Sequence, residues 1–129
     1  MEYKPQERYE IVDKIDISDV ISKHIIYAPF IASSAKPGNF VILMKDEKSE
    51  RIPVTLVDFD RVNGTITVII QSIGKSTAEI NLMKNGDSFL NVSGPLGTPV
   101  EIKKWGTVVG VGGGVGIAEL YPIAKAFKE

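Results

Sequence analysis

The segment Gly74–Thr77 combines residue types that could bind a phosphate. It is not a phosphate-binding P-loop, because that motif needs a further glycine five residues before the glycine of this segment, and Ile69 stands there. A weaker phosphate site stays open, since a glycine lets the backbone approach an anion, and Ser76 and Thr77 lie where a predicted helix has free N–H groups. The alternative is a capped helix that binds nothing, because Ser76 and Glu79 have capping-box spacing.

A run of glycines from Gly110 to Gly116 separates an apolar stretch from a predicted helix. The dinucleotide-binding fingerprint G-x-G-x-x-G does not fit it, because Val115, Ile117 or Glu119 replaces the third glycine in each register. The glycines still allow a pyrophosphate to approach the backbone between strand and helix. Nucleotide binding and a flexible connector both stay open. The glycines that would bind the nucleotide are Gly112, Gly113, Gly114 and Gly116.

The segment Arg51–Thr55 carries a proline inside a predicted strand. Proline removes one donor from the strand ladder, so such a strand lies at a sheet edge or where a ligand takes the place of a neighbour. A plain edge strand is the alternative. No metal site is predicted, because the chain has no cysteine and its one histidine, His24, cannot form a site alone. We expect His24 to be a strand residue with a local structural role, since no nucleophile–His–Asp arrangement can be argued from the sequence.

The composition excludes several classes of protein. The 129 residues allow one domain with its own core. The net charge of −1 gives no field that would attract nucleic acid or an anionic membrane. The first residues are charged, and no apolar run approaches the roughly 20 residues of a membrane span. The sequence therefore predicts a soluble, cytoplasmic protein with no nucleic-acid or membrane partner.

Residues 1–104 predict a small antiparallel barrel. Turn signals at Lys36-Pro37-Gly38 and Asn63-Gly64 separate short apolar runs, and in the first run Ile11 and Ile15 would point inward. From Ser76 to Lys84 the apolar spacing changes to that of a short helix. The expected strands are Tyr9–Ile15, Ile21–Ala28, Phe40–Met44, Arg51–Phe59, Thr65–Gln71 and Phe89–Val92, with Gly94–Gly97 as a loop after the last.

Residues 105–129 have a different residue pattern from that of the predicted barrel. Thr107–Val111 predicts a strand, the glycines a turn, and Ile117–Phe127 a helix, which is how a Rossmann-like nucleotide-binding domain begins. One β-α unit cannot bury both of its faces, so we expect a fragment of a longer protein or a segment that packs on the barrel or a partner. Self-association through this segment is also predicted, because unpaired strand edges and apolar helix faces seek partners.

In their order and spacing, these segments resemble the ferredoxin-NADP reductase superfamily over nearly the whole chain. Within it they look most like the subunits that feed electrons to dihydroorotate dehydrogenase, and like the small subunit of NADH-dependent reduced ferredoxin:NADP oxidoreductase, also described as a sulfide dehydrogenase subunit. Glu119, where many relatives have proline, favours the second. The motifs that carry the resemblance are KPGNFV at Lys36–Val41, RIPVT at Arg51–Thr55, IGKST at Ile73–Thr77, GPLG at Gly94–Gly97 and GGGVGIAELYPIAKA at Gly112–Ala126.

The resemblance implies a six-stranded antiparallel Greek-key β-barrel with one capping helix, which binds FAD over residues 1–104. The first β-α unit of an incomplete Rossmann-like NAD(P)-binding domain would follow over residues 105–129. Relatives continue with a cysteine cluster for a [2Fe–2S] centre, which is therefore expected only beyond Glu129. In relatives an arginine lies three residues before the hydroxyl that contacts flavin N5, whereas Arg51 lies four before Thr55.

The resemblance also implies a role for each site residue. Thr55 would be the catalytic position, hydrogen-bonded to flavin N5, and Val54 would take the place of a stacked tyrosine. Gly74, Ser76 and Thr77 would hold the pyrophosphate. The other implied FAD contacts are Arg51, Ile52 and Pro53 on the strand along the isoalloxazine, and Ile69, Ile70 and Gln71 along the ribityl and adenosine side.

The implied function is electron transfer through FAD between NAD(P)H and an iron–sulfur partner, with little activity in this chain alone. The implied partner is a larger oxidoreductase subunit of ferredoxin:NADP oxidoreductase, glutamate synthase-like or dihydroorotate dehydrogenase type. The alternative, from a different class, is a non-catalytic subunit-docking barrel with an empty flavin cleft. The short chain and the lack of a catalytic acid–base pair favour that alternative.

Overall fold

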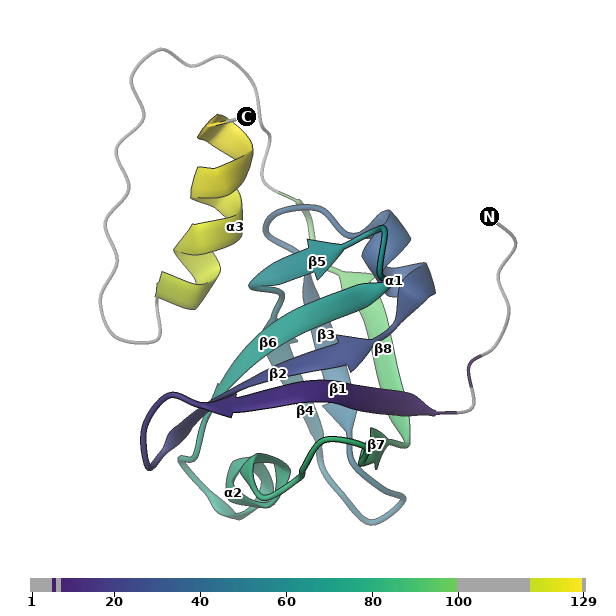
Figure 1. The fold of residues 1–129 in the computed structure, drawn as a ribbon, viewed down its shortest axis with the longest axis vertical. Coiled ribbons are helices and arrows are strands. Elements are labelled where there is room, and N and C mark those ends of the chain that lie inside the picture. The colour runs from purple at the N-terminus through teal and green to yellow at the C-terminus, as the bar shows by residue number, and fades with distance from the viewer. Residues whose placement is uncertain (1–5, 7, 100–116, 129) are drawn as a thin grey trace.

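A computed structural model of the chain describes residues 6, 8–99 and 117–128. In these ranges most of the regular structure is β-strand, with three helices (Figure 1). The strands are β1 (Tyr9–Asp16), β2 (Ile21–Tyr27), β3 (Phe40–Met44), β4 (Arg51–Thr55), β5 (Asp58–Asp60), β6 (Thr65–Gln71), β7 (Ser88–Phe89) and β8 (Asn91–Leu96). The helices are α1 (Pro29–Ser34), α2 (Lys75–Asn81) and α3 (Ile117–Lys128).

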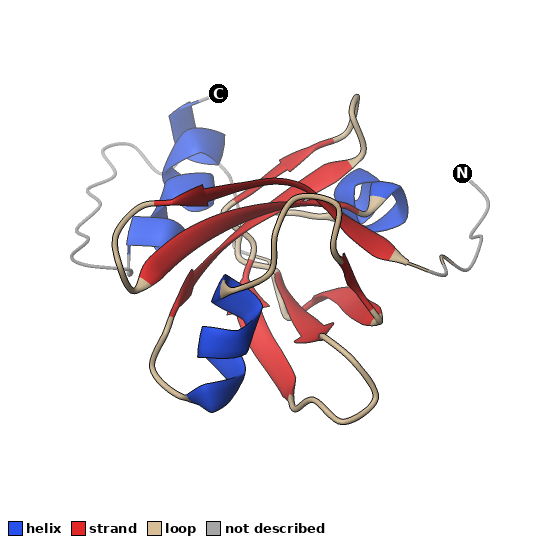
Figure 2. Cartoon of the chain, turned by 60° about the horizontal axis from the view of Figure 1, so that its bottom comes forward, coloured by secondary structure: helices blue, strands red, loops and turns tan. Residues whose placement is uncertain are grey.

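Two antiparallel sheets enclose one core (Figure 2). The larger sheet has the strand order β5-β6-β2-β1-β7 and the smaller has the order β4-β3-β8. Side chains from both sheets, among them Ile26, Leu43 and Phe89, are fully buried between them. The predicted mainly β, antiparallel fold with a late helix is confirmed. The barrel matches only loosely, because the described strands number eight rather than six and pair as two sheets rather than one closed ring.

The predicted strand Arg51–Phe59 is two strands, because the chain passes from one sheet to the other within it. β4 pairs with β3 in the smaller sheet, and β5 pairs with β6 in the larger. Leu56 N–H donates to Asn39 O at 3.1 Å. The next residue, Val57, donates its N–H to Thr67 O at 2.9 Å. Both side chains are buried, so the crossing itself is part of the core.

A β-bulge in β1 makes the prediction for Ile15 wrong. Ile11 and Asp13 pair with successive residues of β2, so Val12 is an extra residue in the ladder. One extra residue moves the side chains that follow it to the opposite face of the strand. Ile11 is therefore fully buried as predicted, whereas Ile15 is 42% exposed.

Both predicted turns are confirmed. At Lys36–Gly38, the N–H of Asn39 donates to Lys36 O at 3.0 Å. Gly64 ends the turn between β5 and β6 with a φ of +70°, and a Cβ there would lie 2.9 Å from Pro29 Cβ. Glycine is therefore required at this turn both by the backbone conformation and by the space around it.

Three further segments differ from the prediction. Pro29 does not simply end a strand but begins α1, a position where its missing N–H costs no helix hydrogen bond. The predicted strand Phe89–Val92 divides between β7 and β8, which belong to different sheets. The predicted loop Gly94–Gly97 is strand as far as Leu96, because β8 pairs with β3 along this stretch.

Helix α3 agrees with the predicted helix Ile117–Phe127, and an ion pair of 3.2 Å joins its Lys125 Nζ to Asp58 Oδ1 on β5. The predicted strand Thr107–Val111, the glycines from 110 to 116 and the boundary after residue 104 lie outside the described residues. The beginning of an NAD(P)-binding domain and self-association through this segment therefore stay predictions. None of the described helices has both the length and the apolar character that crossing a membrane requires.

Candidate functional site

Strand β4 carries five of the predicted site residues and lies at an edge of the smaller sheet. Among the described strands it pairs only with β3. The side chains of Ile52 and Val54 pack against the core, and Thr55 is half-buried. Arg51 and Pro53 are exposed. One edge of β4 is therefore unpaired among the described strands, which agrees both with a ligand at this edge and with a plain edge strand.

The end of β6 presents its three predicted site residues on two different faces. Ile70 is 2% exposed and its side chain belongs to the core. Ile69 is half-buried and Gln71 is exposed, because successive side chains of a strand point to opposite faces. A ligand beside β6 would meet the side chains of Ile69 and Gln71, and Ile70 could contribute only its backbone.

The turn before α2 is organised by Thr77, and the predicted capping pair of Ser76 and Glu79 is wrong. The N-cap of α2 is Gly74, which places Thr77 three residues later. Thr77 Oγ1 accepts from Ile73 N–H at 2.9 Å and from Gly74 N–H at 3.2 Å. A threonine hydroxyl thus does here what the glutamate of a capping box does elsewhere, and the helix begins one residue earlier than predicted.

Ser76 connects this turn to β4. Its Oγ donates to Glu50 Oε2 at 2.8 Å, and Glu50 directly precedes β4, which also contacts β6. A Cβ on Gly74 would meet no heavy atom within 4 Å, so the backbone of the turn faces open space. The structure thus brings β4, the end of β6 and the turn before α2 next to one another. The fourth predicted segment, Gly112–Gly116, lies outside the described residues.

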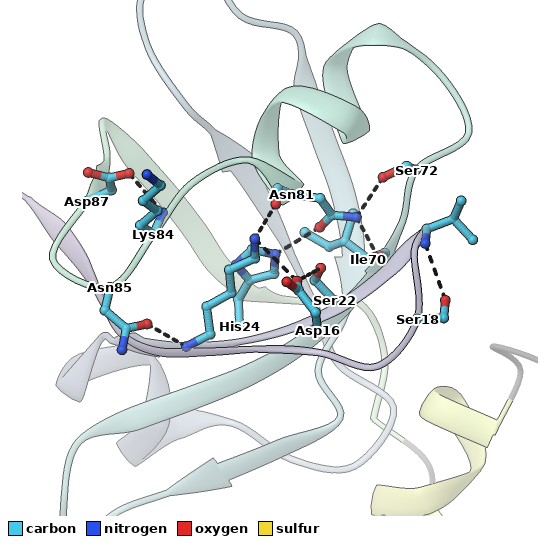
Figure 3. Close-up of polar contacts among 12 residues, drawn as sticks. Asp16, Ser18, Ser22, His24, Ile70, Ser72, Asn81, Lys84, Asn85 and Asp87 are labelled. Carbon is cyan, nitrogen blue, oxygen red and sulfur yellow. Dashed lines mark hydrogen bonds and ion pairs between the residues drawn. The ribbon is translucent and has the colours of Figure 1, made fainter.

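Asn81, which no sequence pattern marks, ties α2 to the larger sheet (Figure 3). Its Nδ2 donates to Ile70 O at 3.0 Å and to Ser72 Oγ at 2.8 Å. Its Oδ1 lies 2.9 Å from His24 Nε2. These partners are 9, 11 and 57 residues away in the sequence, so only the folded chain shows them together.

His24 is a buried residue of β2, which agrees with the expected strand position. Its side chain is fully buried, and this burial lowers the pKa of His24, partly opposed by the hydrogen bond to Asn81. Asn81 Nδ2 donates to one carbonyl and one hydroxyl, so the Oδ1 of the same amide faces the imidazole of His24. This oxygen can only accept, so it accepts from His24 Nε2–H. Nδ1 has no hydrogen-bond partner in the described part of the chain, which fits a neutral imidazole.

A polar groove of about 1100 Å³ lies over the β1–β2 turn and the end of α2, and none of the predicted site residues lines it. Its charged residues are of both signs: Lys14, Lys84, Asp16 and Asp19. Ser22 Oγ donates to Asp16 Oδ1 at 2.7 Å, and Lys14 Nζ lies 3.3 Å from the same oxygen. These two contacts lower the pKa of Asp16. Within residues 6, 8–99 and 117–128, no cluster of three His, Cys, Asp or Glu could hold a metal ion.

Sequence comparison relates the chain to electron transfer subunits, although no protein-family model matches it. It is 48% identical over 120 residues to a Thermotoga maritima protein named as a homologue of the dihydroorotate dehydrogenase B (NAD(+)) electron transfer subunit. That alignment covers 93% of this chain and 43% of the relative. It is 28% identical over 125 residues to the dihydroorotate dehydrogenase B (NAD(+)) electron transfer subunit of Fusobacterium nucleatum, covering 92% of this chain and 48% of the relative.

Solved structures agree with these relatives. A structure of NADH-dependent reduced ferredoxin-NADP oxidoreductase matches with 44% identity and a TM-score of 0.92, over 98% of this chain and 46% of that one. A cytochrome P450 reductase of Amycolatopsis matches with 18% identity and a TM-score of 0.74, over 93% of this chain and 38% of that one, which shows the fold alone. This chain thus spans less than half the length of each of these four proteins. It is a homologue of the dihydroorotate dehydrogenase B-type electron transfer subunits and has a ferredoxin-NADP reductase-like fold.

Proposed function

We propose that this chain is the FAD-binding part of an oxidoreductase subunit that transfers electrons between NAD(P)H and an iron–sulfur partner protein. The observation that carries the proposal is the juxtaposition of the β4 edge, the end of β6 and the open turn at Gly74. A flavin dinucleotide needs apolar surface for its ring system and a separate place for its pyrophosphate, and these three segments offer both. The electron-transfer part of the proposal is supported by the names of the relatives.

The side chains present fit FAD by their chemistry. Val54 and Ile69 offer half-buried apolar surface, and the half-buried hydroxyl of Thr55 can donate a hydrogen bond to a flavin ring nitrogen. Ser76 and the first N–H groups of α2 would hold the pyrophosphate. The hydroxyl of Thr77 already accepts from the N–H groups of Ile73 and Gly74, so we assign it the task of shaping the turn rather than contacting the phosphate.

When bound, the flavin would supply the redox chemistry, because it accepts two electrons with a hydride and can release them singly. The chain positions the flavin and, through Thr55, adjusts its potential. A nicotinamide nucleotide would use the glycines Gly112–Gly116 together with residues that follow Glu129, where a [2Fe–2S] site would also lie. We propose a larger oxidoreductase subunit as the partner, of ferredoxin:NADP oxidoreductase, glutamate synthase-like or dihydroorotate dehydrogenase type.

Flavin binding tests the proposal directly. The purified chain, titrated with FAD, is expected to quench flavin fluorescence with a dissociation constant in the micromolar range or below. Thr55→Ala is expected to change the potential of the bound flavin, and Ser76→Ala is expected to weaken binding. A folded chain that leaves FAD fluorescence unchanged at micromolar concentrations would refute the proposal.

One observation favours the second candidate, a subunit-docking barrel with an empty flavin cleft. The carboxylate of Glu50 already accepts a hydrogen bond from the hydroxyl of Ser76, so a negative charge lies beside the proposed phosphate position. If docking is the function, Thr55→Ala and Ser76→Ala leave binding to the partner subunit unchanged and no flavin copurifies. Flavin that copurifies and is lost with Ser76→Ala excludes this candidate.

A further inference from the structure

All polar atoms of the Asn81 side chain are used, and each partner belongs to a different part of the fold (Figure 3). Nδ2 donates to the carbonyl of Ile70 at the end of β6 and to the hydroxyl of Ser72 in the turn that follows. Oδ1 accepts from His24 Nε2 on β2 at 2.9 Å. An amide that satisfies two acceptors and one donor fixes its own orientation and the positions of its three partners.

The partners of Asn81 are themselves held firmly. His24 is fully buried and Ile70 is 2% exposed, so both belong to the core. Ser72 N–H donates to Val20 O at 2.7 Å, in the turn between β1 and β2. Lys14 Nζ donates to the backbone carbonyl of Asn81, which adds a second connection from β1. The C-terminal end of α2 is therefore tied to the core rather than to solvent-exposed side chains.

These bonds close a loop of chain that contains the proposed pyrophosphate site. The segment leaves the sheet at Ser72, forms the turn at Ile73–Thr77 and returns through α2 to Asn81, which bonds to the hydroxyl of Ser72. Both ends of the loop are thus joined through one amide. Because α2 is a rigid rod of less than two full turns, a shift of its last residue also shifts Ser76 relative to β4.

We propose that Asn81 is a positioning residue for the cofactor-binding turn: it holds Ser76 and the backbone of the turn at the place where they meet the pyrophosphate. This inference rests on the proposed function. Asn81 itself does not touch the cofactor, because its side chain is saturated by Ile70, Ser72 and His24. Its loss is therefore expected to affect the phosphate end of the ligand and to spare the flavin ring, which would lie along β4.

The test compares FAD with riboflavin, which has the ring system but no phosphate. In Asn81→Ala, the dissociation constant for FAD is expected to rise about tenfold, as the loss of oriented hydrogen bonds implies. The dissociation constant for riboflavin is expected to stay at the wild-type value. The matched control is Asn85→Ala, because Asn85 Oδ1 also bonds to β1, accepting from Lys14 N–H at 2.8 Å, yet does not reach the turn. This control is expected to change neither constant.

A milder variant protects the test against a failure to fold. Ser72→Ala removes only the bond that closes the loop and is expected to raise the FAD constant about threefold, again without an effect on riboflavin. Equal losses for FAD and riboflavin, or no loss for either, in folded Asn81→Ala and Ser72→Ala would overturn the positioning role while leaving the FAD-binding function standing. A wild-type chain that binds neither ligand overturns both proposals at once.

Discussion

The contact between Ser76 and Glu50 predicts that a single charge limits the affinity for FAD. Ser76 Oγ donates to Glu50 Oε2 at 2.8 Å, and the carboxylate is exposed. A phosphate oxygen that replaced it as the acceptor would stand about 3 Å from the same hydroxyl. Both negative charges would then lie close together unless the glutamate moved away. Glu50→Gln keeps an acceptor oxygen for Ser76 and removes the charge.

The size of the effect follows from the separation of the two charges. At about 5 Å, two unit charges repel by about 0.8 kcal/mol in water and by about 3 kcal/mol at an effective dielectric constant of 20. Because Glu50 is exposed, the lower value applies. Glu50→Gln is therefore expected to tighten FAD binding about fourfold at low ionic strength. At 1 M salt the Debye length is about 3 Å, so the gain should nearly vanish.

Titration of flavin fluorescence at 10 mM and at 1 M salt measures this gain. Glu47→Gln is the matched control, since it removes the same charge three residues earlier in the same loop, and it should bring a smaller gain. The reasoning is refuted if Glu50→Gln binds FAD no more tightly than the wild type at low salt. It is equally refuted if the gain is the same at 1 M salt, because a charge effect at an exposed site must be screened.

Four further outcomes are expected. Thr55→Ala should shift the two-electron potential of bound FAD by about 20 mV, the equivalent of one hydrogen bond, in a spectroelectrochemical titration. Burial lowers the pKa of His24 below its usual 6.5, so the unfolded state binds a proton at a higher pH than the folded state does. The free energy of unfolding should therefore decrease as the pH falls below about 6.5. His24→Gln should remove this part of the pH dependence in urea unfolding and leave FAD binding at neutral pH intact. Gly64→Ala should destabilise the fold by about 1–3 kcal/mol, because its Cβ would clash with Pro29, as thermal unfolding would show. Light scattering should show a larger particle for the whole chain than for one ending at Trp105, and monomers in both cases would contradict self-association.

Local signals predicted the parts of the fold that depend on neighbouring residues. The predicted strands Phe40–Met44 and Thr65–Gln71 coincide with β3 and β6, because turn residues bound both runs and their side chains suit a pleated sheet. The split of Arg51–Phe59 could not be predicted, since it depends on which sheet receives each half. The bulge at Val12 is equally hidden, because only pairing with β2 shows the extra residue.

The candidate site divides in the same way. The order of the motifs predicted that Arg51–Thr55 and Gly74–Thr77 act together, and the bond from Ser76 to Glu50 places them side by side. Which face of a strand each side chain occupies could be determined only from the structure. An example is Ile70, whose side chain is in the core. Asn81 was not predicted at all, because its significance arises from partners that are distant in the sequence.

The order of strands in the two sheets also determines when the chain can fold. Tyr9 in β1 lies opposite Phe89 in β7, and β3 pairs with both β4 and β8. The larger sheet is therefore incomplete until Phe89 has been synthesised, and the smaller sheet is incomplete until Leu96 has been synthesised. Pairings between distant segments form slowly, and the apolar residues of the early strands stay exposed until their partner strands have been synthesised. We expect a nascent chain to acquire its structure in one late step, after the last strand has joined the smaller sheet.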